Sequence, residues 1–228
     1  MRSIQLDVKT FLSAQPVFQD LTAGELGRLA DAVTVRSLPR QATLFRAGQA
    51  CDGLYFVAHG QAKLYVQSES GHEKVIEVIG AGDCVSEALT FSDETHTVSA
   101  TTLTDALVLC VPRDVLLGEI ARNGHLAISL LTRMSGRMNR LTRAIEALTL
   151  RSGVGRVVDY LLHAPVAAEA HRDHLTVALP ASKGTIASLL SVTPEHFSRI
   201  LHDLQDRGLI AIDRRRIHIL DAGRLACV

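Results

Sequence analysis

The sequence predicts an α+β fold that joins an antiparallel β-roll, one long helix and a C-terminal winged helix-turn-helix. Three observations predict it. Glycines separate short apolar runs between residues 43 and 111, apolar side chains then recur every three or four residues between 127 and 148, and two short helical patterns occupy residues 183–210. The corresponding domains are expected at residues 1–124, 125–150 and 151–228.

The predicted β-roll rests on the spacing of its glycines. Short apolar runs that suit antiparallel strands are separated by Gly48, Gly53, Gly60, Gly71, Gly80 and Gly82. Residues 82–97 do not continue this pattern of short apolar runs separated by glycines. We therefore expect a short helix there that approaches a ligand.

The long helix is predicted by a 4-3 spacing of apolar residues that starts at Ala127 and is typical of a coiled coil. We interpret the stripe as a dimer interface formed by Leu131, Met134, Met138, Leu141, Ile145 and Leu148. The other faces carry arginines, which we expect to be solvated: Arg133, Arg137, Arg140 and Arg143. The alternative is a helix that packs on its own β domain.

The second of the two short helices has clear start and stop signals. Thr193 can cap its free N–H groups, and Pro194 occupies the first helical position, where its missing donor costs nothing. Gly208 closes the helix. An inward stripe is expected from Phe197, Ile200, Leu201 and Leu204, and residues 185–190 suit a short supporting helix.

Glu195, Ser198 and Arg199 lie together on another face of this second helix. In a DNA major groove, arginine pairs with guanine, glutamate accepts from the cytosine amine, and serine bonds either kind of base edge. The spacing therefore predicts a DNA-recognition helix, and we expect further DNA contacts from Thr193, His196, Lys183 and Thr185. The alternative is an ordinary surface helix with solvated charges.

A β-hairpin wing is predicted at residues 211–220, with Ile217 and Ile219 facing inward. Three consecutive arginines, 214–216, lie at its tip, and Arg215 and Arg216 are the expected phosphate contacts. A solvated turn is the alternative. The formal net charge of zero divides into −5 for residues 1–124 and +5 for residues 125–228, which suits a sensor joined to a nucleic-acid binder.

Several classes of protein are disfavoured. The chain has no nucleophile elbow, H-E-x-x-H pair or phosphate-binding glycine loop, so we do not expect an enzyme. It has no signal peptide and no long apolar span, which predicts a cytoplasmic protein without membrane contact. The four cysteines are too scattered for a metal motif and are expected to be free thiols: Cys51, Cys84, Cys110 and Cys227.

Together these features resemble the Crp/Fnr superfamily of bacterial transcription regulators. The family's recognition motif E-x-x-S-R is present as Glu195, Ser198 and Arg199. The resemblance implies a homodimer that binds a TTGAT-type palindrome in double-stranded DNA, works with RNA polymerase and responds to an effector. A hinge is expected at residues 151–155, where Gly153 and Gly155 relax the backbone.

The predicted effector pocket departs from the cAMP-binding branch of that family. Its members carry G-E-L followed by R-S or R-T, whereas the matching residues here are Ser86, Glu87 and Ala88, followed by His96 and Thr97. We expect Glu87, His96 and Thr97 to line the pocket. Because the phosphate-binding arginine is absent, cAMP is disfavoured. An iron–sulfur cluster is disfavoured as well, since no cysteine precedes Cys51.

The Dnr-type branch is the most similar, through the strings E-K-V-I-E-V, S-E-A-L-T-F and P-E-H-F-S-R-I. That resemblance implies haem, nitric oxide sensing and control of denitrification genes. The metal ligand is left open among His59, His72, His96, His125, His163, His171, His174, His196, His202 and His218. Two alternatives remain: a cyclic nucleotide or other small-molecule effector, and a haem gas-binding protein with a vestigial DNA domain.

Overall fold

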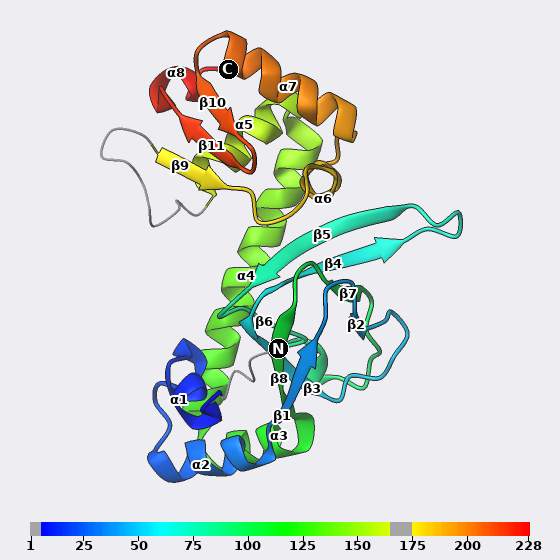
Figure 1. The fold of residues 1–228 in the computed structure, drawn as a ribbon. Helices are drawn as coiled ribbons and strands as arrows, with labels where there is room; N and C mark the ends of the chain where they lie inside the picture. Colours follow the sequence, from blue (N-terminus) through cyan, green and yellow to red (C-terminus); the bar gives the residue numbers. More distant parts are fainter. Residues whose placement is uncertain (1–5, 165–174) are drawn as a thin grey trace. The chain divides into compact units, whose positions relative to one another are not determined.

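The computed structural model describes residues 6–164 and 175–228 of the chain (Figure 1). His171 and His174 lie outside these residues. The chain divides into two compact units: the first comprises residues up to 66 together with 77–140, and the second comprises residues 67–76 together with 141–228. Strand β5 (Glu73–Gly80) and helix α4 (Gly124–Leu150) contribute residues to both units.

The first unit opens with a group of short helices, α1 (Val8–Ser13), η1 (Pro16–Phe18) and α2 (Ala23–Ala32). Helix α2 begins with a capping box, in which the Thr22 side chain accepts from the Glu25 N–H and the Glu25 carboxylate accepts from the Thr22 N–H. Helix α3 (Arg113–Arg122) follows the last strand of the roll. A buried carboxylate, Glu119, joins α3 to α2 by accepting two hydrogen bonds from Arg28, both 2.7 Å long.

Two four-stranded sheets form the β-roll. One has the order β1-β8-β3-β6, built from β1 (Thr34–Leu38), β8 (Ala106–Pro112), β3 (Gly53–His59) and β6 (Cys84–Val85). The other has the order β2-β7-β4-β5, built from β2 (Thr43–Phe45), β7 (Ser99–Thr102), β4 (Gln61–Gln67) and β5. A 3-10 turn, η2 (Leu89–Phe91), occupies the segment where a short helix was expected.

Strand β3 shows why the roll is stable, because its side chains alternate between two apolar cores. Leu54 and Phe56 pack in the core beneath the terminal helices, and Tyr55 and Val57 pack in the core inside the roll. Strand β8 divides its side chains in the same way. A strand covered on both faces reads as a continuous apolar run in the sequence, as this one does.

The second unit contains α5 (Gly153–His163), α6 (Lys183–Leu189), α7 (Pro194–Asp206), α8 (Ala222–Ala226) and a three-stranded sheet. The sheet has the order β10-β11-β9, from β10 (Ile210–Asp213), β11 (Arg216–Ile219) and β9 (Leu175–Ala178), and both pairings are antiparallel. Figure 1 shows α6, α7 and the β10–β11 hairpin together in this unit. The predicted α+β fold with a winged helix-turn-helix is confirmed.

Three of the five residues of the expected hinge are helical. Helix α4 ends at Leu150, and α5 begins at Gly153 because the Ser152 hydroxyl accepts from the Gly155 N–H at 3.0 Å. Both glycines therefore lie in the first turn of a helix, and only residues 151–152 are non-helical. A side chain at Gly153 would bring its Cβ within 3.2 Å of the Val192 side chain, so the close packing of these two residues favours glycine at this position.

Candidate nucleic-acid interface and effector site

Helix α7 has a buried face and an exposed face, as its sequence predicts. The buried face consists of Phe197, Ile200, Leu201 and Leu204. The Thr193 hydroxyl accepts from the His196 N–H at 3.1 Å and so fixes the start of the helix. Gly208, at a φ of +69°, lets the chain leave the helix in a left-handed conformation.

The exposed face of α7 carries the predicted recognition residues. Glu195 and Arg199 are exposed, and Ser198 is half-buried between them. Among the described residues, neither Glu195 nor Arg199 forms a salt bridge. Arg199 therefore presents its donors, and Glu195 its acceptors, to whatever approaches this face.

The expected flanking contacts lie at the starts of the two helices. His196 is exposed in the first turn of α7. Lys183 is half-buried at the start of α6, where the Ser182 hydroxyl accepts from the Thr185 N–H at 3.1 Å. The Thr185 hydroxyl lies 2.9 Å from that of Ser182. A helix start with free N–H groups favours anions.

The wing has the predicted shape, with Ile217 and Ile219 buried and residues 214–216 exposed. Arg214 adopts a φ of +54° in the turn. The Arg215 guanidinium donates to the carbonyl of Leu179, the residue that follows β9, at 3.3 Å. The hairpin thus holds three adjacent cations in a defined turn.

Along α4, the predicted stripe is largely exposed in this single chain. Leu131, Met138 and Ile145 are 55%, 65% and 63% exposed. Leu141 and Leu148 are also exposed, and Met134 is half-buried. Exposed apolar side chains at this regular spacing are typical of a surface that another helix covers.

Two arginines of α4 do not behave as expected. Arg137 donates to Glu87 at 2.8 Å and to Glu77 at 2.7 Å, and Arg133 donates to Glu87 at 3.3 Å. Their side chains are only 20% and 26% exposed. The prediction that they are solvated was wrong. A buried carboxylate needs compensating charge, and α4 supplies it. The sequence signal for these ion pairs was Glu87 itself, a carboxylate in the expected ligand segment to which no partner had been assigned.

Glu87, His96 and Thr97 do not form one cluster of free side chains. The Glu87 carboxylate is held by the two arginines and accepts from the Cys84 thiol at 3.2 Å. Thr97 is exposed. His96 is buried, and its ring stacks on Phe45 with a centroid separation of 3.8 Å.

Two buried polar atoms in this region have no hydrogen-bond partner among the described residues, the Ser86 hydroxyl and His96 Nε2. Burial lowers the pKa of His96, so its imidazole is held neutral, although the nearby Asp52 opposes the shift. Ser86 also has a φ of +73°, a conformation that favours glycine. It occupies the glycine position of the G-E-L motif.

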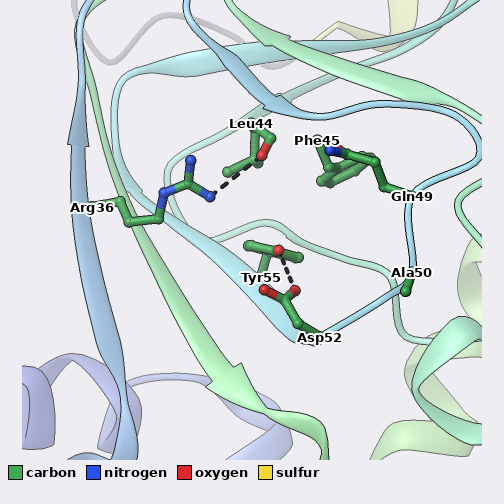
Figure 2. A pocket seen from close by; sticks show the side chains of 7 residues that line it. All are labelled: Arg36, Leu44, Phe45, Gln49, Ala50, Asp52 and Tyr55. Carbon is green, nitrogen blue, oxygen red and sulfur yellow. Dashed lines mark hydrogen bonds between the residues drawn. The ribbon is translucent and has the colours of Figure 1, made fainter.

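A cavity of about 430 Å³ opens beside Phe45 (Figure 2). It is lined by Arg36, Leu44, Phe45, Gln49, Ala50, Asp52 and Tyr55. Figure 2 shows the Arg36 guanidinium bonded to the Leu44 carbonyl, and the Tyr55 hydroxyl bonded to the Asp52 carboxylate. The walls thus carry one cation and one anion. Among the described residues, no group of three or more His, Cys, Asp or Glu could hold a metal ion.

The cysteines are free thiols, as expected. Cys84 and Cys110 are buried, Cys51 is half-buried and Cys227 is exposed. Burial raises the pKa of Cys110 to about 12 and also raises the pKa of Cys84 and Cys51. Thiols with raised pKa values are poor nucleophiles at neutral pH.

Comparison with known proteins identifies the family. A cyclic nucleotide-binding domain matches residues 35–123, and a Crp-like helix-turn-helix domain matches residues 155–228. The solved structure of DNR from Pseudomonas aeruginosa is 32% identical, with 96% of each chain covered and a TM-score of 0.51. The chain belongs to the Crp/Fnr family of transcription regulators.

Curated Crp/Fnr relatives cover nearly the whole chain. The CRP-like cAMP-activated global transcriptional regulator of Mycobacterium tuberculosis is 27% identical over 94% of this chain and 96% of that protein. The anaerobic regulatory protein of Bacillus subtilis is 26% identical over 89% of this chain and 87% of that protein. This Crp/Fnr chain is therefore a transcription regulator with an effector-binding domain and a DNA-binding helix-turn-helix. None of its described helices is both long and apolar enough to cross a bilayer.

Proposed function

We propose that this regulator is a homodimer that recognises a TTGAT-type palindrome through α7, acts with RNA polymerase in the cytoplasm and is not an enzyme. The proposed domains are a sensor at residues 1–124, a dimerisation helix at 125–150 and a DNA-binding domain at 151–228. One observation carries the proposal. Helix α7 has a capped start, a buried apolar face and an exposed face that presents Glu195, Ser198 and Arg199.

The chemistry of that face supports base recognition. The guanidinium of Arg199 can donate two hydrogen bonds to guanine O6 and N7, and the Glu195 carboxylate can accept from a cytosine amine. The flanking contacts proposed above from Lys183, Thr185, Thr193 and His196 would set the position of the helix on the phosphate backbone. Arg215 and Arg216 of the wing would add phosphate contacts that do not depend on sequence.

Dimerisation is supported by the exposed apolar stripe of α4 (Leu131, Met134, Met138, Leu141, Ile145 and Leu148). A second copy of the same helix offers the matching surface, and two copies related by a two-fold axis suit a palindromic site. The two recognition helices would then contact half-sites about one helical turn of DNA apart.

For the effector, the site geometry disfavours cAMP. The cyclic phosphate would meet His96 in place of an arginine, and burial keeps this imidazole neutral. The cations near Glu87 are Arg133 and Arg137 of α4, and both are already paired with carboxylates. One candidate effector is a different small molecule, which would displace a carboxylate from one of these arginines and bind in its place.

Nitric oxide bound through haem is the other candidate, favoured by the likeness to DNR over 96% of the chain. Haem iron would supply the site that binds the gas. His96 Nε2 is buried and has no partner among the described residues. The cavity lined by Phe45 does not fit haem as it stands, because its walls carry the charges of Arg36 and Asp52, His96 is not among its lining residues, and Phe45 covers the imidazole face.

DNA recognition is tested by titrating the protein on a TTGAT-N4-ATCAA duplex and on a scrambled duplex at one salt concentration. Arg199→Gln should cost about 1–3 kcal/mol on the specific duplex and relax discrimination at the guanine. The matched control is Arg207→Gln, which changes an exposed arginine at the end of the same helix. Equal affinity of the unaltered protein for both duplexes, without effector and in each effector-loaded sample described below, would refute the proposal.

The effector is tested by repeating the titration with apo protein, with haem-loaded protein, and with haem-loaded protein under nitric oxide. Tight binding in the last sample alone would support the haem candidate. A haem absorption spectrum that is unchanged in His96→Phe would exclude His96 as the iron ligand. Equal DNA binding in all three samples, with no haem uptake, would leave the small-molecule effector.

A further inference from the structure

Lys74 lies near the start of β5, in the hairpin segment 67–76 that belongs to the second unit. Its ammonium group donates to the carbonyl of Ser188 and, at 2.9 Å, to the carbonyl of Leu189. The adjacent Val75 N–H donates to the Ser188 hydroxyl at 2.9 Å, and that hydroxyl donates to the Glu73 carbonyl at 3.2 Å. Four hydrogen bonds thus join the hairpin to one end of α6.

The carbonyls that Lys74 contacts are the last of α6. The final carbonyls of a helix have no donor within the helix, and they form the negative end of its dipole. Arg156 of α5 donates to the next two carbonyls, those of Leu190 at 2.7 Å and Ser191 at 3.1 Å. Two cations from outside α6 and α7 therefore hold the turn between these helices.

That turn determines where α7 begins. Ser191 has a φ of +52°, and the Val192 N–H returns to the Ala187 carbonyl at 3.0 Å. Thr193, the next residue, caps α7. A change in the last turn of α6 must therefore pass into the start of α7, where the proposed recognition residues lie.

We propose that Lys74 is a positioning residue for DNA recognition, which holds the end of α6 and thereby the start of α7. This inference rests on the proposed function of α7. It assigns to a residue outside the helix-turn-helix a direct part in setting the geometry of that motif.

The surroundings of Lys74 support a specific role. Its side chain is half-buried, and both burial and the nearby Arg156 lower the pKa of its ammonium group. A lysine without a structural task extends its charged end into water. Here the hydrogen bonds to α6 offset the cost of removing the charge from water.

Strand β5 also connects this contact to the effector region. Glu77, three residues further along the strand, accepts from Arg137 in the first unit. Arg137 in turn holds Glu87. An effector that displaces Glu87 from Arg137 would therefore act on β5, the strand that carries Lys74.

The experiment compares Lys74→Met, which removes the charge and keeps the length, with Lys74→Arg, which keeps the donors. Lys9→Met is the matched control, since Lys9 is exposed in the first unit. Amide hydrogen exchange of residues 183–193 reports the turn without DNA, and titration on the palindromic duplex reports its consequence. A further variant, Ser188→Ala, removes the other hydrogen bonds of the contact and leaves the lysine in place.

Lys74→Met should speed exchange at the end of α6 and weaken DNA binding about tenfold, a size typical of coupling between sites. Lys74→Arg should restore both, Ser188→Ala should show a smaller increase in exchange, and Lys9→Met should show neither effect. Exchange and affinity that are unchanged in Lys74→Met would overturn the inference. If the unaltered protein binds the duplex in none of the effector states tested, the proposed function fails, and exchange alone still decides whether Lys74 holds the turn.

Discussion

Glu87 is a carboxylate that lies almost entirely out of solvent, and two guanidinium groups make this possible. Charge removed from water costs several kcal/mol per ion unless partners and hydrogen bonds compensate it. Arg137 makes the shorter contact with Glu87, 2.8 Å against 3.3 Å for Arg133, and it also donates to Glu77 and to the carbonyl of Cys84. The ion pairs therefore join α4 to the ligand segment of the roll.

Arg137→Leu should lower the free energy of unfolding by about 3 kcal/mol, because it leaves Glu87 buried with only Arg133 as a partner. Urea denaturation measures the change. The control is Arg140→Leu, an exposed arginine on the same helix, which should stay within about 0.5 kcal/mol of the unaltered protein. Equal stabilities of the two variants would show that the ion pairs contribute nothing.

His96 gives the stability of the first unit a pH dependence. Burial lowers its pKa in the folded protein, whereas the unfolded chain binds a proton at the ordinary value of 6.5. The unfolded state therefore takes up more protons below pH 6.5, and stability falls as the pH decreases through that range. The nearby Asp52 moderates this effect, because it raises the pKa.

His96→Phe should remove this part of the acid sensitivity, since phenylalanine keeps the stacking on Phe45 and has no proton to bind. Thermal unfolding above and below pH 6.5 tests the prediction. The melting temperature of the unaltered protein should fall further on acidification than that of the variant. Thr97→Val, at the exposed neighbouring position, changes no titratable group and is the control, which should keep the full pH dependence.

At the scale of the element, α4 carries two different surfaces on one helix. Its apolar stripe is exposed, and another of its faces holds the arginines that contact the roll. A helix of 27 residues that packs on its own unit mainly through Leu126 and Leu130 leaves most of its apolar side chains uncovered. This is the surface that the proposed homodimer would bury.

Ile145→Glu should convert the proposed dimer into a monomer, because it places two carboxylates in a seam that excludes water. Sedimentation equilibrium measures the mass. Asn139→Glu adds the same charge at an exposed position off the stripe and should leave the dimer intact. A monomeric unaltered protein would contradict the proposal before any variant is made.

The elements that the sequence predicted best are those with local signals. The start of α7 depends on Thr193 and Pro194, and its end depends on Gly208, so nearby residues determine both boundaries. The stripe of α4 follows from helical periodicity alone. Strand β1 was not predicted, because it gains its partners only by pairing with β8, about seventy residues along the chain.

The effector region shows where sequence patterns are insufficient. Glu87 and His96 were identified by alignment with a motif, but their environments depend on distant residues. Arg137 approaches Glu87 from fifty residues away, and Phe45 covers His96 from strand β2. Periodicity places the arginines on a face of α4 and does not show that this face meets a carboxylate.

At the scale of the whole molecule, the balanced net charge conceals two opposite halves. The −5 charge of residues 1–124 repels the phosphate backbone, and the +5 charge of residues 125–228 attracts it. A protein with this distribution should orient its second half toward DNA at long range. The effect should weaken as salt screens the charges.

Replacing Arg215 and Arg216 together with glutamine should reduce the slope of log K against log salt by about 2 to 4, for a dimer that loses two to four phosphate contacts. Affinities on the palindromic duplex at several salt concentrations give the slope. Arg40→Gln, in the first half, is the control. An unchanged slope in the double variant would show that the wing does not contact phosphate.

The pairing of β1 with β8 also constrains the order in which the chain can fold during synthesis. Thr34 pairs with Cys110, so the roll cannot close until the ribosome has made most of its strands. The hairpin that carries Lys74 is made early, but its partner Ser188 follows 114 residues later. Since N-terminal domains generally fold first, the hairpin contact with α6 should be among the last to form. Nascent chains that stop before α6 would hold a complete sensor without DNA affinity.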